Sequence, residues 1–310
     1  MFARLLPASL FAACACVPVD QLPESAGSDR DLHSSEIVRF SEECKKWDEW
    51  DKPAKPFRVH ANTYYVGTCG IAAILITNDE GHILIDTGTQ NGADVVAENI
   101  RSLGFDLSDV RYLTHSHEHF DHVGGFAKVQ ALTGAVIIGN SASIPVLLSG
   151  VPGELDPQHG THPSFPPILA PPASTGWNKI GNGESISVGD VEVFAIETPG
   201  HSPGAFSWHW QACDGDNCKT IVYADSLSPI SSDEHRFSDH PTDLALFREG
   251  LGRIAALDCD ILLTPHPSHS LMVERAATGT FDGGISCAQY ASGKMNDLDA
   301  RLQREAEGDQ

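Results

Sequence analysis

The chain has 310 residues, of which 41% are hydrophobic, and this is enough material for a large buried core in one domain or in two halves. Its 20 Lys and Arg residues are outnumbered by 42 Asp and Glu residues, which gives a net charge of −22. This charge repels polyanions, and no run of Lys or Arg provides a local basic patch, so we expect no nucleic acid partner. The acidity favours solubility instead.

The first residues, 1–17, have the pattern of an export signal. Arg4 is the only positive side chain of this segment, and the apolar run Leu5–Ala13 follows it. The segment is too short to span a bilayer well, and Pro7 interrupts it. We therefore expect a periplasmic or secreted protein. Simple cleavage and a lipid anchor at Cys14 both stay open, and membrane attachment is expected only with the lipid.

Residues 18–43 are polar and rich in Ser, Glu and Asp, so we expect a loosely ordered segment before a single domain at 44–310. The first half of this domain shows alternating apolar runs and helical periodicities. A hairpin turn is expected at Asn78–Gly81, and Gly104 suits the end of a helix. The sequence predicts strands at 57–60, 63–66, 71–77, 82–85, 110–113 and 135–138, and helices around 95–103, 126–132 and 144–148.

The segment Gly150–Gly176 is different, because it holds seven prolines and no apolar period. A loop of this length is usually functional or mobile, and Gln158 within it is a tentative substrate-binding residue. The same loop contains His159 and His162. Beyond the loop, the sequence predicts strands at 185–188, 191–196, 205–210, 220–223 and 261–263, and helices around 241–254 and 287–302. Strands followed by helices in both halves indicate an α/β fold with two packed sheets and helices outside.

The densest cluster of potential metal ligands in the sequence is the motif H-x-H-x-D-H, formed by His117, His119, Asp121 and His122. It lies between an expected strand and an expected helix, a common place for sites in α/β folds. Histidines two residues apart can grip one metal ion, while the Asp-His pair on the next bend can face another. Imidazole suits zinc, and a carboxylate is an acceptable further ligand. A chance His-rich surface loop is a poor explanation of four ligand-type residues in this order.

Two further histidines stand at strand ends in tight turns. His201 follows the apolar run Val191–Ile196, and His266 follows Ile261–Leu263. With these residues the tally becomes six ligands, which suits two zinc ions with three protein ligands each. Three protein ligands leave open positions on each ion, and open positions are typical of catalytic zinc.

Five stretches of the sequence, in order, resemble the metallo-β-lactamase superfamily and specifically the third subclass of the class B β-lactamases. They are Ile85–Gly88, His117–His122, Thr198–His201, Tyr223–Ser228 and Leu263–Pro267. The last two stretches point to the third subclass, whereas the histidine motifs specify only the superfamily. The resemblance implies an αββα sandwich, one domain of two similar halves with two mixed sheets between helices.

The resemblance also implies roles for individual residues. A first zinc ion would take His117, His119 and His201, and a second would take Asp121, His122 and His266. Asp121 counts as catalytic because it orients the hydroxide site, and Asp86 and Asp225 would lie behind the ligands. Ser226 and Ser228 would bind the substrate carboxylate. The implied activity is hydrolysis of the β-lactam amide bond by a hydroxide bound to both zinc ions, which confers antibiotic resistance.

Three other classes share parts of this pattern. A glyoxalase-like thioester hydrolase or a lactonase would use the same dinuclear zinc site, and in thioester-hydrolysing relatives an Asp comparable to Asp225 bridges the metals. A zinc-dependent nuclease is disfavoured by the charge. A non-catalytic metal-binding protein would not need open coordination positions. We assign His115 no metal role, and we expect a monomer that acts on a small molecule.

The eight cysteines separate into two groups. Cys14 and Cys16 lie in the export segment, and six remain, an even number that implies disulfides in an exported chain. Six cysteines allow fifteen pairings. Locality favours Cys213–Cys218 across a hairpin tip, and the other expected pairs are Cys44–Cys69 and Cys259–Cys287. A structural zinc site is a weaker explanation because no C-x-x-C pair occurs.

Overall fold

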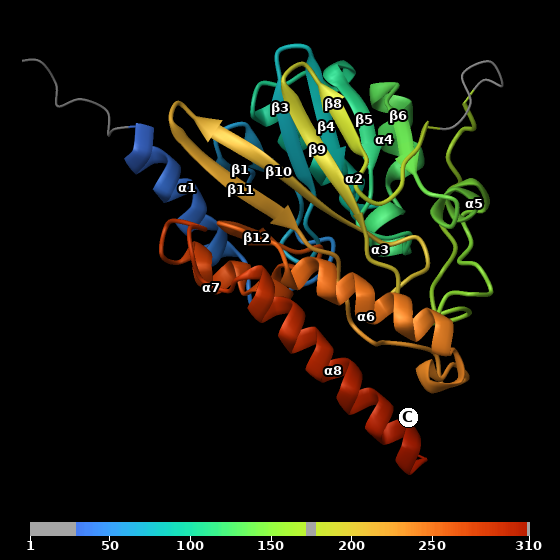
Figure 1. The fold of residues 1–310 in the computed structure, drawn as a ribbon. Coiled ribbons are helices and arrows are strands. Elements are labelled where there is room, and N and C mark those ends of the chain that lie inside the picture. Colours follow the sequence, from blue (N-terminus) through green and yellow to red (C-terminus); the bar gives the residue numbers. More distant parts are fainter. Residues whose placement is uncertain (1–28, 172–177, 309–310) are drawn as a thin grey trace, which may run out of the picture.

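The computed structural model describes residues 29–171 and 178–308. Two β-sheets pack face to face and helices cover their outer faces (Figure 1). This arrangement confirms the α/β sandwich expected from the order of strands and helices, and it follows from burial. Each sheet has one apolar face for the other sheet and one for the helices. The export signal expected at 1–17 lies outside the described residues.

The first sheet has seven strands in chain order. They are β1 (Phe57–His60), β2 (Thr63–Tyr65), β3 (Ile74–Asn78), β4 (Gly81–Ile85), β5 (Val110–Thr114), β6 (Val136–Gly139) and β7 (Asn178–Lys179). The expected hairpin turn is present, since Asn78 pairs with Gly81. Strands β4, β5 and β6 run parallel, so the chain segments that follow β4 and β5 leave the same edge of the sheet. That edge carries the His117–His122 motif.

The second sheet has five strands in the order β12-β11-β10-β9-β8. They are β8 (Ser185–Val188), β9 (Val191–Glu197), β10 (Phe206–Asp214), β11 (Asn217–Tyr223) and β12 (Ile261–Leu263). Only β11 and β12 pair in parallel, with Tyr223 opposite Leu263. The stretches after these two strands, which lead to Ser226 and His266, therefore emerge side by side.

Four helices cover the outer faces of the sheets. α2 (Gly92–Ser102) and α4 (Phe126–Thr133) pack on the first sheet, and α6 (Pro241–Ala255) and α8 (Cys287–Glu307) pack on the second. Pro241 begins α6, where its missing N–H costs nothing. The shorter helices are α3 (Phe120–Val123), α5 (Ser143–Ser149), α7 (Met272–Ala276), η2 (Leu107–Asp109), η3 (Phe237–Asp239) and η4 (Pro267–Ser270).

The core between the sheets is rich in aromatic side chains. Trp208 and Trp210 alternate along β10 toward this core and are almost completely buried. Their indole N–H groups find partners, because Trp208 donates to the carbonyl of His115 and Trp210 to Thr63 Oγ1, at 2.8 and 2.9 Å. Burial of one such side chain contributes about 2–3 kcal/mol. The Trp208 bond also fixes the backbone just before the metal-ligand motif.

The segment expected to be loosely ordered contains a helix, α1 (Asp29–Glu43), so that prediction is wrong for residues 29–43. Ile37 and Phe40, one turn apart, are buried, and the Phe40 ring lies 5.3 Å from the ring of Phe57. Two apolar residues on one helix face are enough to dock α1 on β1, although the polar composition of the segment conceals this face. Residues 18–28 lie outside the described part.

Three disulfides join the six cysteines of the domain, and they are the three expected pairs: Cys44–Cys69, Cys213–Cys218 and Cys259–Cys287. Cys213 and Cys218 face each other across the β10–β11 hairpin.

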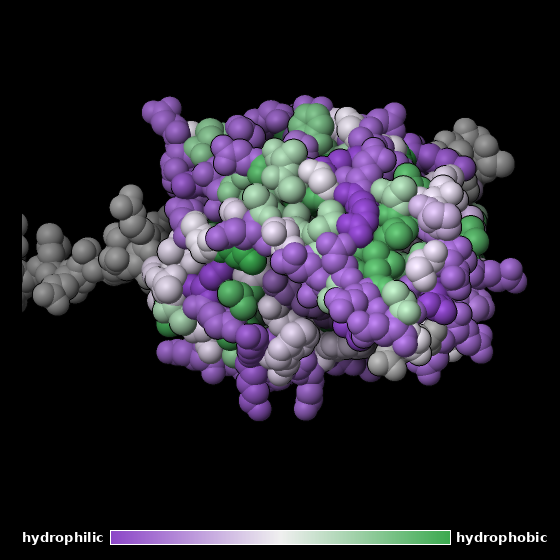
Figure 2. Space-filling model, turned by 60° about the horizontal axis from the view of Figure 1, so that its bottom comes forward, coloured by the Kyte–Doolittle hydropathy of each residue, from purple (hydrophilic) through white to green (hydrophobic). Residues whose placement is uncertain are grey.

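Within the described residues, no helix is long and apolar enough to cross a membrane. Seen from below Figure 1, the surface is mostly hydrophilic, with hydrophobic residues gathered toward the middle of the face (Figure 2).

Candidate active site

The H-x-H-x-D-H motif occupies the bend between β5 and α3. His117 lies in the extended stretch after β5, and His119 is the residue before α3 with φ −86° and ψ 154°. Asp121 and His122 lie in the first turn of α3, so their side chains leave the bend in another direction. All four side chains are buried. A short extended stretch followed by a helical turn thus presents two histidines on one side and an Asp-His pair on the other.

His201 joins the first pair from the second sheet, in the turn that follows β9. One ring nitrogen from each of His117, His119 and His201 lies within 4.8 Å of the others. The turn depends on Gly200, whose φ is +145°, because a Cβ atom there would stand 2.2 Å from Phe247 Cγ. Glycine at this position therefore lets His201 approach the motif while α6 packs behind the turn.

The other ring nitrogen of each of these three histidines has a fixed partner. The partners are Asp225 Oδ1 for His117 Nδ1 at 2.8 Å, Asp156 Oδ2 for His119 Nε2 at 2.8 Å, and the Ser228 carbonyl for His201 Nδ1 at 2.9 Å. Partners of this kind set the tautomer and orientation of metal-binding imidazoles. They leave Nε2 of His117, Nδ1 of His119 and Nε2 of His201 for a ligand.

The second expected set also converges. Asp121 Oδ2 lies 3.1 Å from His122 Nε2 and 3.4 Å from His266 Nε2, and the two Nε2 atoms are 3.4 Å apart. His117, Asp121 and His122 also form a close group of ligand atoms. The structure therefore brings all six expected ligands to one place, at the edge where both sheets end.

Asp86 lies under the second set, as expected. Its φ is +64°, a left-handed conformation that is unfavourable for aspartate, and it is completely buried. It accepts hydrogen bonds from Ser116 N and Oγ at 2.7 Å and from Tyr223 Oη at 2.8 Å, and one of its oxygens lies 3.4 Å from His122 Nδ1. These contacts hold the strained backbone in place. Asp86 thus ties the start of the motif to the His122 ring.

The pKa values of the cluster residues are shifted in different directions. Burial lowers the pKa of His117 and His201 well below the usual range. Burial opposes the charged forms of Asp121 and His122 too, but their mutual attraction holds the pKa of Asp121 low and, with Asp86, raises the pKa of His122 to about 10. Without a metal ion, His122 therefore holds a proton that a cation would displace.

The residues fit a pair of zinc ions. Five imidazoles and one carboxylate are donors that zinc prefers, and the two groups of three leave open positions. Asp121 Oδ2 and the Nε2 atoms of His122 and His266 lie within 3.4 Å of one another, and this is a specific observation in favour of a cation because one ion can be held by all three atoms.

The expected substrate-binding residues lie around the same cluster. Ser226 Oγ is buried and has no hydrogen-bond partner. Gln158 Nε2 lies 3.5 Å from His201 Nε2, and Gln158 Oε1 is 2.9 Å from His162 Nε2. The long proline-rich loop thus reaches the histidine cluster. Asp225 is occupied by His117, which is the position expected of a residue behind the ligands.

Three residues at the site escaped the sequence analysis. Asp156 orients His119 from the long loop, and Tyr290 on α8 donates to the carbonyls of Asp225 and Ser226 at 2.7 and 2.9 Å. The Trp50 ring lies 5.9 Å from the ring of His266 and is 41% exposed. No local pattern marks these residues, because each is brought to the site by a contact distant in sequence. His115 is buried, and neither ring nitrogen has a hydrogen-bond partner.

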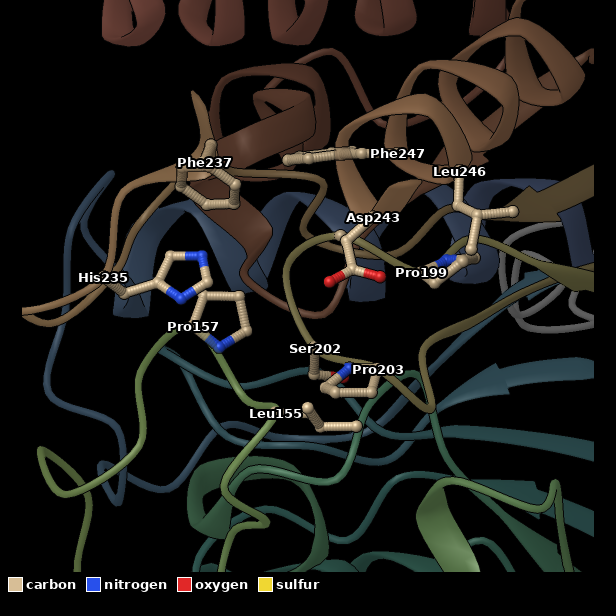
Figure 3. Close-up of a pocket in the computed structure, with 11 residues that line it drawn as sticks. Leu155, Pro157, Pro199, Ser202, Pro203, His235, Phe237, Asp243, Leu246 and Phe247 are labelled. Carbon is tan, nitrogen blue, oxygen red and sulfur yellow. The ribbon is translucent and has the colours of Figure 1, made fainter. Parts of the chain in front are cut away.

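A cavity of about 160 Å³ lies between the turn at 199–203 and residues of α6 such as Asp243 and Phe247 (Figure 3). Leu155 and Pro157, the neighbours of Asp156, line it together with Gly200, Ser202 and Phe247. None of the six expected ligands lines this cavity. It is therefore not the reaction site, although it adjoins the two segments that carry Asp156 and His201.

Comparison with known proteins agrees with this geometry. The family model described as the metallo-beta-lactamase superfamily matches residues 66–215, which include five of the six expected ligands. The structure titled MIM-2 metallo-beta-lactamase is 49% identical, covers 87% of this chain and 98% of its own, and superposes with a TM-score of 0.80. MEM-A1, a subclass B3 metallo-beta-lactamase from a soil metagenome library, is 37% identical, covers 84% of this chain and all of its own, with a TM-score of 0.78.

A curated relative gives a weaker match. The hydroxyacylglutathione hydrolase of Maricaulis maris is 27% identical over 38% of this chain, and the chain spans only 34% of that protein's length. The thioester hydrolase likeness thus covers about a third of the relative, whereas the B3 likeness covers nearly the whole of each solved structure. The chain therefore belongs to the metallo-β-lactamase superfamily and resembles its subclass B3 members.

Proposed function

We propose that the protein is a zinc-dependent hydrolase that opens the amide bond of β-lactams. The observation that carries the proposal is the convergence of six ligand side chains, of which three have their second ring nitrogen fixed by a partner. When bound there, zinc supplies Lewis acidity that activates water as a nucleophile and polarises the substrate carbonyl. No serine or cysteine nucleophile is needed.

The chain's own residues orient the reaction. Asp121 brings the only negative charge among the six ligands, and it lies between His122 and His266. Asp225, Asp156 and the Ser228 carbonyl keep the first three imidazoles in one tautomer, so their free nitrogens point at a common position. Ser226 follows Asp225 in the chain, and the Ser228 carbonyl accepts from His201, which supports the proposal that the hydroxyls of Ser226 and Ser228 bind the carboxylate that β-lactams carry.

The contacts of Asp225 favour the β-lactam over the thioester function. A bridging aspartate would have to turn a carboxylate oxygen toward both ions, but Asp225 Oδ1 accepts the His117 Nδ1–H bond at 2.8 Å, and its backbone N–H donates to Ser207. Both contacts hold Asp225 behind the first set of ligands. The glyoxalase-like function and the lactonase function remain outcomes of the test.

The deciding experiment measures steady-state hydrolysis of a penicillin, a cephalosporin, a carbapenem, a glutathione thioester and a lactone by the zinc-loaded protein. We expect β-lactam turnover that a chelator abolishes and zinc restores, and no loss with compounds that acylate a serine nucleophile. Turnover of the thioester alone would replace the proposed function with the glyoxalase-like one. Elemental analysis of the same sample should find about two zinc ions per chain.

We further propose export to the periplasm and a role in antibiotic resistance. The support is the signal pattern at 1–17 together with the three disulfides, which form in oxidising compartments. Expression of the full chain in a Gram-negative host should raise the inhibitory concentration of a β-lactam, and deletion of residues 2–17 should remove this protection. Protection without the signal would contradict the export proposal.

A further inference from the structure

The turn at Ser226–Ser228 is held from outside the sheet by α8. Tyr290 Oη donates to the carbonyls of Asp225 and Ser226, and Lys294, one helical turn further on, donates to Ser228 Oγ at 2.7 Å. Between the two serines, Leu227 has φ +49°, a left-handed conformation that leucine rarely adopts. The helix thus stabilises a strained turn in which two serine hydroxyls lie two residues apart.

Lys294 differs from the other buried cations of the described chain, which are Arg275 and Arg301. Arg301 pairs with Glu305 at 2.8 Å, and Arg275 donates to three backbone carbonyls. Lys294 is only 9% exposed, and within the described residues its one hydrogen bond goes to the neutral hydroxyl of Ser228. Its Nζ also lies 5.5 Å from the centre of the Tyr290 ring, and the charges of Asp297 and Asp225 attract it without forming an ion pair. An ammonium group has three donors, so two remain for another acceptor.

A buried ammonium group that forms no ion pair is costly, and an anion in contact with it would reduce that cost. Burial lowers the pKa of Lys294 to about 8, so the side chain is still mainly cationic at neutral pH. Ser226 Oγ is a second observation that points to a ligand, because Ser226 is only 1% exposed and its buried hydroxyl has no hydrogen-bond partner. Two N–H groups of Lys294 and the hydroxyl of Ser226 are therefore available to donate hydrogen bonds to a ligand.

The hydrogen-bond directions also suit an anion. Because Lys294 occupies a lone pair of Ser228 Oγ, the hydroxyl proton of Ser228 points away from the ammonium, and polarisation by the charge strengthens it as a donor. In this structure that proton goes to the Ser226 carbonyl at 3.1 Å, which is a long bond for a hydroxyl. The Ser228 carbonyl accepts from His201, so the group adjoins the first set of ligands.

The charge of the whole protein opposes the approach of an anionic substrate, and a local cation would offset this repulsion. The net charge is −22, which repels a carboxylate at long range. We propose that Lys294 of α8 is a substrate-binding residue that supplies the positive charge of a carboxylate subsite shared with Ser226 and Ser228. The inference rests on the proposed function, and it adds a specificity-determining residue from the C-terminal helix.

The test uses binding to the metal-free protein, where hydrolysis does not interfere, and then turnover by the zinc-loaded protein. The probes are benzylpenicillin and its methyl ester, which differ in the carboxylate charge and in one methyl group. Calorimetry on wild type should show the acid binding at least about tenfold more tightly than the ester, because a charge-assisted bond is lost in the ester. Lys294→Met should remove this preference while the affinity for the ester stays within twofold.

Two further variants separate charge from structure. Lys294→Gln keeps a donor for Ser228 Oγ but has no charge, so it should lose the preference for the acid, whereas Lys294→Arg should keep most of it. Lys128→Met, at the surface of α4 and paired with Asp94, is the matched control and should change nothing. In zinc-loaded enzyme, Lys294→Gln should raise KM for the acid about tenfold with little change in kcat.

The outcomes distinguish this inference from the proposed function. If wild type does not prefer the acid, or if Lys294→Gln keeps the preference, the carboxylate subsite does not include Lys294. An equal loss for acid and ester in all three variants would make Lys294 a structural residue and would also overturn the inference. Acid-selective binding by the metal-free protein with no β-lactam turnover would overturn the proposed function alone and would leave the anion site in place.

Discussion

The two sets of proposed metal ligands differ in how tightly the protein holds them. In the first set, each of the three histidines has its second ring nitrogen bound to a buried acceptor within 2.9 Å. In the second set, His122 has only a 3.4 Å approach to Asp86, and His266 is partly exposed beside Trp50. The first set is preorganised by the second sheet and the long loop, whereas the second set depends more on the metal itself. We therefore expect the first ion to bind more tightly.

The largest effect should come from Asp121→Asn, because the substitution removes the only charged ligand. We expect activity to fall on the order of 100-fold and the second ion to be lost while the first is retained. Activity against a β-lactam and zinc per chain by elemental analysis would be measured together. Asp94→Asn on the surface is the control, and loss of both ions from the Asp121 variant would remove the distinction between the sets.

Asp156→Asn changes the residue that orients His119 in the first set. The amide can still contact His119 Nε2, but it no longer holds the ring by a charged acceptor, so zinc affinity of the first set should fall about 10- to 100-fold. Competition with a zinc chelator would measure both affinities. The same substitution at Asp86 should weaken mainly the second set, and equal effects of both variants on both ions would show that the two sets act as one unit.

The pH dependence of zinc affinity should also differ between the two sets. The pKa of His122 is raised to about 10, so between pH 7 and 10 zinc must displace its proton, and second-set affinity should rise about tenfold per pH unit. In the metal-free protein the sign is opposite. The His122 ion pair stabilises the fold fully below its ordinary pKa of 6.5 and is lost as pH rises toward 10. Thermal unfolding of metal-free protein at pH 6 and 10 checks the second statement, and a flat profile would contradict it.

The smallest effect should follow Trp50→Ala. The indole covers His266 and also lies 5.6 Å from the Phe120 ring, so its removal frees His266 without touching a ligand bond. We expect second-set zinc affinity to weaken about two- to fivefold, in keeping with an aromatic contact of about 0.5–1 kcal/mol. First-set affinity serves as the internal control. A change in the first set alone would contradict the proposed division.

The sequence alone determined the class of fold and the set of candidate metal ligands. Periods of two and of 3.6 residues predicted most strands and helices close to their observed bounds, because burial on one face imposes these periods. The six ligands were found because metal chemistry restricts residue type and spacing within a short motif, and because His201 and His266 share a strand-end context. The pairing of Cys213 with Cys218 likewise followed from closeness along the chain.

Tertiary structure decided everything that depends on contacts between distant segments. Asp156 meets His119 across 37 positions, and Lys294 meets Ser228 across 66 positions, so no local pattern announces either contact. The helix α1 was missed for the same reason, since Ile37 and Phe40 become a buried face only against Phe57 and Tyr65. Local sequence fixes which atoms can bind a metal or a substrate. Only the packing of two sheets and α8 fixes which partner holds each of those atoms, because hydrogen bonds to a ring or an ammonium act over about 3 Å of space and are indifferent to distance along the chain.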